Sequence, residues 1–136
     1  MLLPKLLREG VRMEAGTIDL DRYDRGILVV TLRGEHDLAT ARRLQETLAW
    51  WFSYSVAVIV DLSEATFIDS SILKVFIMAM RDRQPIALVA PPGGAPRRLF
   101  DLVRLDDAIP TYDTFADALA RQRGRDDDLL ADPAAT

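Results

Sequence analysis

The residues best placed to do chemistry in this chain are Asp69, Ser70 and Ser71, which stand between an apolar run and an amphipathic one. Oxygen-bearing side chains at such a boundary are typical of a helix N-terminus, where backbone N–H groups lack partners. A hydroxyl held there beside a carboxylate also suits a phosphoryl acceptor, because the helix dipole stabilises a dianionic phosphate. The residues alone favour Ser70 as a helix cap and leave the phosphoacceptor as the sharper alternative.

Other side chains that could take part in catalysis are few. The chain has 136 residues, a single histidine and no cysteine. This composition excludes a thiolate zinc site and a cysteine nucleophile, and it leaves little for a Ser-His relay or a His-based metal cluster. No pair of carboxylates has a spacing that argues for hydrolysis. We therefore expect no enzyme activity, no catalytic residue, no cofactor and no metal.

Two further groups of side chains are not expected to do chemistry. His36 falls in a predicted loop, where we expect a solvated or locally hydrogen-bonded side chain rather than a ligand. Arg97, Arg98 and Arg104 fall on one predicted helix, where we expect a solvated basic face that could meet an acidic partner surface.

The net charge and the N-terminal residues indicate the compartment. The formal net charge of −4 argues against an electrostatic grip on nucleic acid or on an anionic membrane. The apolar residues at the N-terminus are interrupted by Pro4 and Lys5, so they match neither a signal peptide nor a membrane span. We expect a cytoplasmic protein without a nucleic-acid or membrane partner.

The elements that must position the serines follow from the spacing of apolar residues, with continuous runs for buried strands and helical spacing for helices. We expect strands at 17–23, 27–32, 56–61 and 86–90, an edge segment at 109–112, and helices at 38–51, 70–82, 96–106 and 114–121. This order predicts an α/β fold with a mixed sheet. The domain is expected to span 17–121, between a flexible N-terminal extension at 1–16 and a disordered C-terminal tail at 122–136.

The helix predicted at 70–82 has an unusually narrow polar face. Its inward stripe is expected to be Ile72, Val75, Phe76, Ala79 and Met80. Leu73 and Ile77 lie to one side of that stripe and Met78 lies on the other, which leaves only a thin polar line. Either neighbouring helices bury these flanks, or part of the face docks a partner.

Several segments of the chain resemble the STAS domain of bacterial anti-sigma factor antagonists, and the similarity covers roughly Thr17 to Ala120. In order along the chain, they are Gly34–Asp37, Asp61–Ser63, Phe67–Ser71 and Arg97–Leu102. The resemblance implies a STAS-like fold, a four- or five-stranded mixed sheet with about four helices packed mainly on one face. It also implies a module that binds an anti-sigma factor with serine kinase activity and thereby releases a sigma factor.

The same resemblance assigns the site. In such proteins the serine directly after the aspartate is phosphorylated, which here is Ser70, and phosphorylation by the bound kinase ends the interaction. The aspartate of the Gly-Glu-x-Asp loop lies near that serine in the family, and here it is Asp37. The expected partner-binding residues are Asp37, Asp69, Ser71, Ile72, Leu73 and Ile77.

Ile72 departs from the family pattern, which usually has glycine two residues after the phosphorylated serine. A β-branched side chain adds bulk where a kinase and its nucleotide would approach. Together with the apolar flanks of the helix, it favours an alternative function, a non-phosphorylated accessory subunit of a signalling assembly or of a lipid-transport ATPase complex. The sequence leaves open which partner is bound and whether the chain forms a homodimer.

Overall fold

A mixed sheet forms the centre of the domain in the computed structural model, which describes residues 16–131 and the side chains of residues 16–124. The strands are β1 (Thr17–Tyr23), β2 (Ile27–His36), β3 (Ala57–Asp61), β4 (Ala65–Ile68), β5 (Ile86–Val89) and β6 (Thr111–Tyr112). Their order is β1-β2-β3-β5-β6, with β4 paired to the end of β2. Only β1 and β2 are antiparallel among the described pairs. The predicted α/β fold with a mixed sheet is confirmed.

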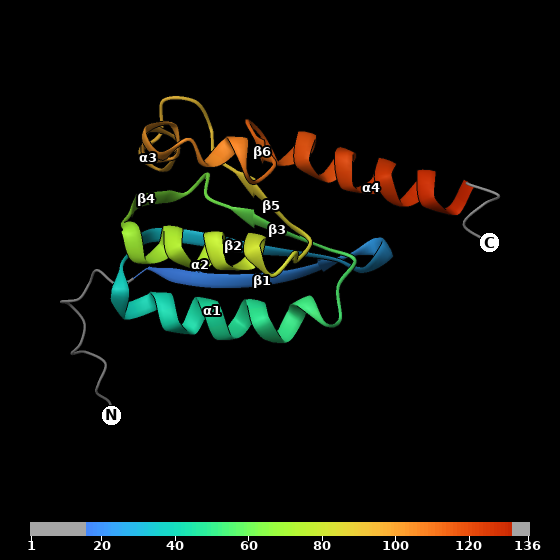
Figure 1. Ribbon diagram of the computed structural model, residues 1–136, viewed down its shortest axis with the longest axis horizontal. Helices are drawn as coiled ribbons and strands as arrows, with labels where there is room; N and C mark the ends of the chain where they lie inside the picture. Colours follow the sequence, from blue (N-terminus) through green and yellow to red (C-terminus); the bar gives the residue numbers. More distant parts are fainter. Residues whose placement is uncertain (1–15, 132–136) are drawn as a thin grey trace.

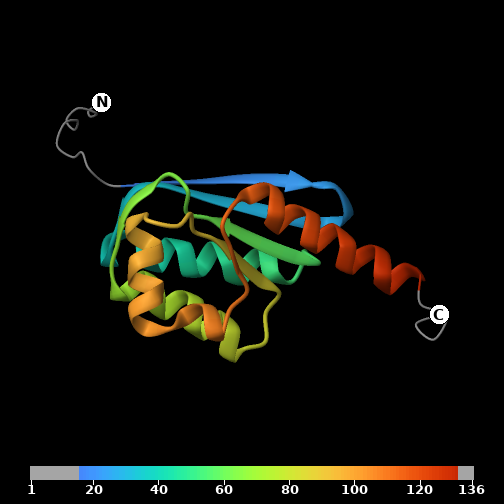
Figure 2. The same cartoon turned by 90° about the horizontal axis from the view of Figure 1, so that it is seen from above.

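The helices cover the two faces of the sheet unequally (Figures 1 and 2). They are α1 (Leu38–Phe52), α2 (Ser70–Arg81), α3 (Ala95–Val103) and α4 (Phe115–Ala131), with short 3-10 turns at Asp24–Gly26 and Leu105–Asp107. The larger hydrophobic core joins α1, α2 and α3 to one face, and a smaller core joins α4 to the other. The helices are therefore packed mainly on one face, as expected.

Successive side chains of β2 point to opposite faces of the sheet, and both faces are apolar, so both must be covered. Leu28 and Val30 enter the larger core, whereas Ile27 and Val29 enter the smaller one. A continuous apolar run is what a strand buried on both faces requires. Within the larger core α2 meets α3 through the rings of Phe76 and Phe100, whose centroids lie 6.3 Å apart at an edge-to-face angle of 80°.

β2 is longer than the predicted strand at 27–32 because it carries a bulge. It pairs with β3 up to Thr31, and beyond a register shift between Gly34 and Glu35 it pairs with β4 instead. Gly34 has a φ of 83°, a left-handed conformation that favours glycine. The bulge brings His36 into register with Ile68, the last residue of β4.

The ends of the chain differ from the predicted domain bounds. α4 continues to Ala131, so residues 122–131 are helical where a disordered tail was expected. Residues 132–136, and the predicted extension apart from Gly16, lie outside the described residues. Among residues 16–131, no helix has both the length and the apolar character needed to cross a bilayer.

Candidate functional site

Two helices begin side by side at one edge of the sheet. His36 and Ile68 are register partners in the β2–β4 ladder, and the next residues, Asp37 and Asp69, are the N-caps of α1 and α2. Each aspartate accepts a hydrogen bond of 2.9 Å from the backbone N–H two residues later. Figure 1 shows both helices starting at this edge. The partial positive charges of two helix ends therefore meet beside two carboxylates.

Ser70 and Ser71, although adjacent, have different environments. Ser70 is the first residue of α2 and is exposed, and its hydroxyl has no hydrogen-bond partner among the described residues. Ser71 is half-buried, and its hydroxyl donates to Oδ1 of Asp69. Asp69, rather than Ser70, caps the helix, so the simpler interpretation of Ser70 as a cap is wrong. Of the two hydroxyls, only that of Ser70 is free to react with an incoming group.

The structure brings together part of the expected partner-binding set. Asp37 is exposed, and Asp69 and Ser71 are half-buried beside it at the start of α2. Ile72 and Leu73 are only 0% and 6% exposed, because they pack into the larger core. Direct partner contact was expected of both, and for both this is wrong. Since the Ile72 side chain points inward, its bulk does not obstruct the surface at Ser70.

The apolar flanks of α2 are covered on one side only. Ile77 is half-buried and packs against the larger core, as Leu73 does. Met78, on the other flank, remains 37% exposed. One flank is therefore buried, as the first alternative has it, and the other faces solvent, where a partner could reach it.

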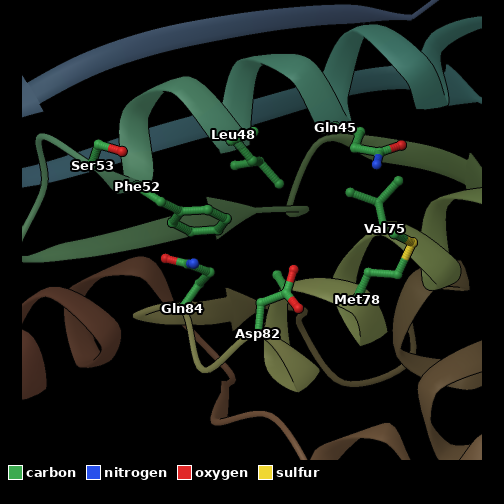
Figure 3. Close-up of a pocket in the computed structure, with 10 residues that line it drawn as sticks. Gln45, Leu48, Phe52, Ser53, Val75, Met78, Asp82 and Gln84 are labelled. Atoms are coloured by element: carbon green, nitrogen blue, oxygen red, sulfur yellow. The ribbon is translucent and has the colours of Figure 1, made fainter.

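Met78 lines a groove between α1 and α2 (Figure 3). One part of it has a volume of about 170 Å³, where Leu48 and Phe52 of α1 face Val75 of α2. It continues toward Ser71 as a hollow of about 410 Å³ that shares Val75 and Met78 with the first part. The groove thus leads along α2 to the end at which Ser70 lies.

The Ser70 end of the groove combines apolar and basic side chains. Leu38, which directly follows the Asp37 cap, is 76% exposed there. Arg42 and Lys74 are exposed and line the same hollow from α1 and α2. The sequence pattern gave no sign of this groove, because it depends on how far apart α1 and α2 lie.

His36 is the last residue of β2 and directly precedes Asp37, the N-cap of α1. It is fully buried at the end of β2, not in a loop, and Nε2–H donates to the carbonyl oxygen of Arg33 at 3.0 Å. Nδ1 lies 3.1 Å from the Thr40 hydroxyl and accepts its hydrogen when the ring is neutral. Burial lowers the pKa of His36 below its usual value. The imidazole is locally hydrogen-bonded, one of the two expectations, and it is not solvated.

The expected basic face of α3 is divided among local interactions. Nη1 of Arg97 donates to the carbonyl oxygen of Ala90 at 2.7 Å and to Oδ1 of Asp113 at 2.8 Å. Arg98 donates to a backbone carbonyl in the preceding loop, and Arg104 pairs with an aspartate three residues later. Of the three, Arg97 joins α3 to the residues that directly follow β5 and β6, while Arg98 and Arg104 are exposed. Nor do the described residues contain a cluster of His, Cys, Asp or Glu side chains arranged to hold a metal ion.

Comparisons with known proteins agree with this architecture. Residues 18–118 match the family model of the STAS domain. The crystal structure of an anti-sigma factor antagonist from Mycobacterium paratuberculosis is 30% identical, with a TM-score of 0.74 over 82% of this chain and 97% of that chain. No curated protein matches the chain.

Two structures of the anti-sigma factor antagonist SpoIIAA share the fold at lower identity. The unphosphorylated form is 21% identical, with a TM-score of 0.66 over 79% of this chain and 97% of that chain. The phosphorylated form, from Bacillus, is 20% identical, with a TM-score of 0.60 over 77% and 98%. With its family match and the relative from Mycobacterium, the chain belongs to the STAS domain family, in the group of anti-sigma factor antagonists.

Proposed function

We propose that this protein binds an anti-sigma factor and so releases a sigma factor, and that phosphorylation of Ser70 ends the binding. The observation that carries this proposal is the exposed Ser70 hydroxyl, which has no partner among the described residues and stands at the first turn of α2. The 30% identical relative is an anti-sigma factor antagonist, and SpoIIAA has both a phosphorylated and an unphosphorylated form.

Ser70 serves as the substrate of this reaction and not as its catalyst. Oγ of Ser70 forms a bond to the γ-phosphorus of ATP held by the partner kinase, and the bond from that phosphorus to ADP breaks. The hydroxyl proton passes to a base on the kinase. The metal ion that accompanies ATP also belongs to the kinase.

The phosphate changes the surface without disturbing the fold. The Ser70 hydroxyl makes no hydrogen bond to any residue that the structure describes, so its modification breaks none of those bonds. The N–H groups and the dipole at the start of α2 stabilise a dianion at this position. The carboxylates of Asp37 and Asp69 already lie there, and the added charge makes the corner strongly negative. An anti-sigma factor that presents carboxylate or apolar groups to it is repelled.

The groove between α1 and α2 supplies the rest of the binding surface. Leu38 and Met78 offer exposed apolar contacts near Ser70. Arg42 and Lys74 add positive charge to the same hollow. Such a surface suits an amphipathic partner segment with acidic residues at its edge.

Phosphate transfer is the direct test. The protein is incubated with its cognate anti-sigma factor kinase and ATP, and the modified residue is located by mass spectrometry. We expect one phosphate on Ser70 of the unaltered chain, none on Ser70→Ala, and full modification of the matched control Ser71→Ala. Modification of Ser71, or no added phosphate, would contradict the assignment.

Binding measurements make a further prediction at Ser70. Ser70→Ala is expected to fold, to bind the anti-sigma factor as tightly as the unaltered chain, and to resist release by ATP. Ser70→Asp places a permanent charge at the site and is expected to weaken binding by about tenfold or more, a loss of about 1.4 kcal/mol. Calorimetric titration measures both variants, and equal affinities for them would argue against an electrostatic switch.

Co-purification from the native cells separates this function from the accessory-subunit alternative. The argument for that alternative from Ile72 is weakened by the burial of its side chain. Recovery of a histidine-kinase-like ATPase with the protein supports the antagonist. Recovery of transporter subunits instead would support the accessory role.

A further inference from the structure

A second pocket lies at the end of α2 that is far from Ser70. It has a volume of about 310 Å³, is open to solvent, and is bordered by the end of α2, the start of β5, the turn before β6 and the inward face of α4. Met80, Ile86 and Ile109 supply apolar side chains to its lining, which also carries polar groups. It shares none of the residues that surround Ser70 and only Gln84 with the groove between α1 and α2.

Gln122 is the unusual member of this lining. It follows Phe115, Ala118 and Leu119 at helical spacing on the inward face of α4, where the other members of the row pack in the smaller core. The Gln122 side chain is only 5% exposed, and its Nε2 has no hydrogen-bond partner among the described residues. A buried amide donor without a partner destabilises a fold, so its presence needs an explanation.

Arg83 and Gln84 add further donors to the pocket, and the amide oxygen of Gln84 can also accept. Arg83 is exposed, and its guanidinium makes no ion pair among the described residues. The carbonyl oxygens of Pro85 and Pro110 already accept hydrogen bonds of 2.7 Å and 2.9 Å from neighbouring strands, and prolines have no N–H. A molecule in this pocket would therefore meet the unpartnered amide of Gln122, one cation and the apolar side chains of Met80, Ile86 and Ile109.

From these groups we propose that the pocket binds a small monocarboxylate with an apolar body. A carboxylate oxygen accepts from Nε2 of Gln122 and the negative charge faces Arg83, while the apolar body packs on Met80, Ile86 and Ile109. A single cation matches a monoanion better than the double charge of a phosphate group. The volume lies at the lower end of the usual range for ligand pockets. The proposal is independent of the function proposed for Ser70.

Octanoate is a suitable probe, with 1-octanol and inorganic phosphate as the neutral and the dianionic comparison. In a titration followed by ¹⁵N–¹H correlation spectra, octanoate is expected to shift the Gln122 side-chain amide and the backbone amides of Arg83 and Ile86. Gln122→Met and Arg83→Gln are each expected to weaken octanoate binding by about tenfold or more. The matched control Gln45→Met alters a glutamine of the other groove and should leave the affinity unchanged.

Stability gives a second readout that needs no ligand. Gln122→Met replaces an amide that has no partner by an apolar group of similar size, so the melting temperature of the free protein should rise by about 3 °C. A fall in melting temperature would show that the amide has a structural role and would overturn the proposal. So would octanoate shifts confined to the groove between α1 and α2, no shifts at all, or equal binding of octanoate and 1-octanol.

Discussion

Adjacent serines differ in this domain because they take different positions in one helical turn. Successive residues of an α-helix are separated by about 100° around its axis. The second helical residue places its N–H and hydroxyl toward the Asp69 cap, and the first, Ser70, faces solvent. Composition and spacing could not distinguish the two serines, and only the family resemblance separated them.

Asp69 contributes to stability as a cap, and Ser70 does not. Asp69→Ala removes the acceptor of two hydrogen bonds from Ser71 and is expected to lower the free energy of unfolding by about 1–2 kcal/mol. Ser70→Ala is expected to change it by less than about 0.5 kcal/mol. Urea titrations of the two variants measure the difference, and a larger loss for Ser70→Ala would mean that its hydroxyl is bonded within the fold.

His36 was predicted in a loop because Gly34 and Asp37, on either side of it, are typical turn residues. The β4 pairing that extends β2 depends on a strand distant in sequence, so local residue types could not reveal it. The burial of His36 is completed by Gly16, whose backbone N–H donates to the carbonyl oxygen of Glu35 at 2.8 Å. A Cβ at Gly16 would lie 2.3 Å from Nε2 of His36, so only glycine fits.

Burial of His36 makes stability depend on pH in a defined direction. The folded state lowers the pKa of His36, so below the unfolded value of about 6.5 the unfolded chain binds a proton that the folded chain does not. The free energy of unfolding is therefore expected to fall as pH drops from 7 to 5, by at most about 1.4 kcal/mol per pH unit for one group.

Urea titrations across this pH range test the assignment. The chain has one histidine, so His36→Gln should remove most of the slope between pH 7 and pH 6. A variant that retains the full slope would show that another group is responsible.

At the scale of elements, α2 shows what helical periodicity can and cannot predict. The spacing correctly placed Ile72, Phe76 and Ala79 in the core and gave nearly the observed bounds. It could not say which neighbour covers each flank, since that depends on the packing of α1 and α3. The buried Leu73 and the exposed Met78 are the result of that packing.

Met78 offers a test of the groove that spares the fold. Because its side chain is 37% exposed, Met78→Asp is expected to leave the melting temperature nearly unchanged and to weaken anti-sigma factor binding by about tenfold. Trp50→Asp is the control, since Trp50 is exposed on α1 outside the groove. Equal losses of affinity for both variants would contradict a docking role for the groove.

At the scale of the whole molecule, the order of elements and the mixed sheet were predictable, because long apolar runs and helical spacings dominate them. β4 was missed because four residues, of which Thr66 and Phe67 are exposed, give too short a pattern. The end of α4 was missed because its later residues are mostly polar, and polar residues alone do not distinguish a projecting helix from a tail.

α4 is required for the second face of the sheet. Phe115, Ala118 and Leu119 cover Ile27 and Ile59 there. Full burial of an isoleucine side chain contributes about 1.5–3 kcal/mol to the stability of the fold. A chain that ends at residue 113 is expected to lose cooperative unfolding and to aggregate. A chain that ends at residue 124 keeps these contacts and should melt cooperatively. Circular dichroism during heating compares the two, and cooperative melting of the shorter chain would show that α4 is dispensable.

The Ser70 hydroxyl has no hydrogen-bond partner among the described residues, and this affects how a covalent modification of it can act. A group added there breaks no hydrogen bond among the described residues, so we expect it to act on an approaching partner and not through a change in the fold. Its effect is expected only on the binding of a partner protein at this surface. If Ser70 is the phosphorylated residue, as proposed, the rate of the response is therefore set by the enzymes that act on it and not by a conformational step of this domain.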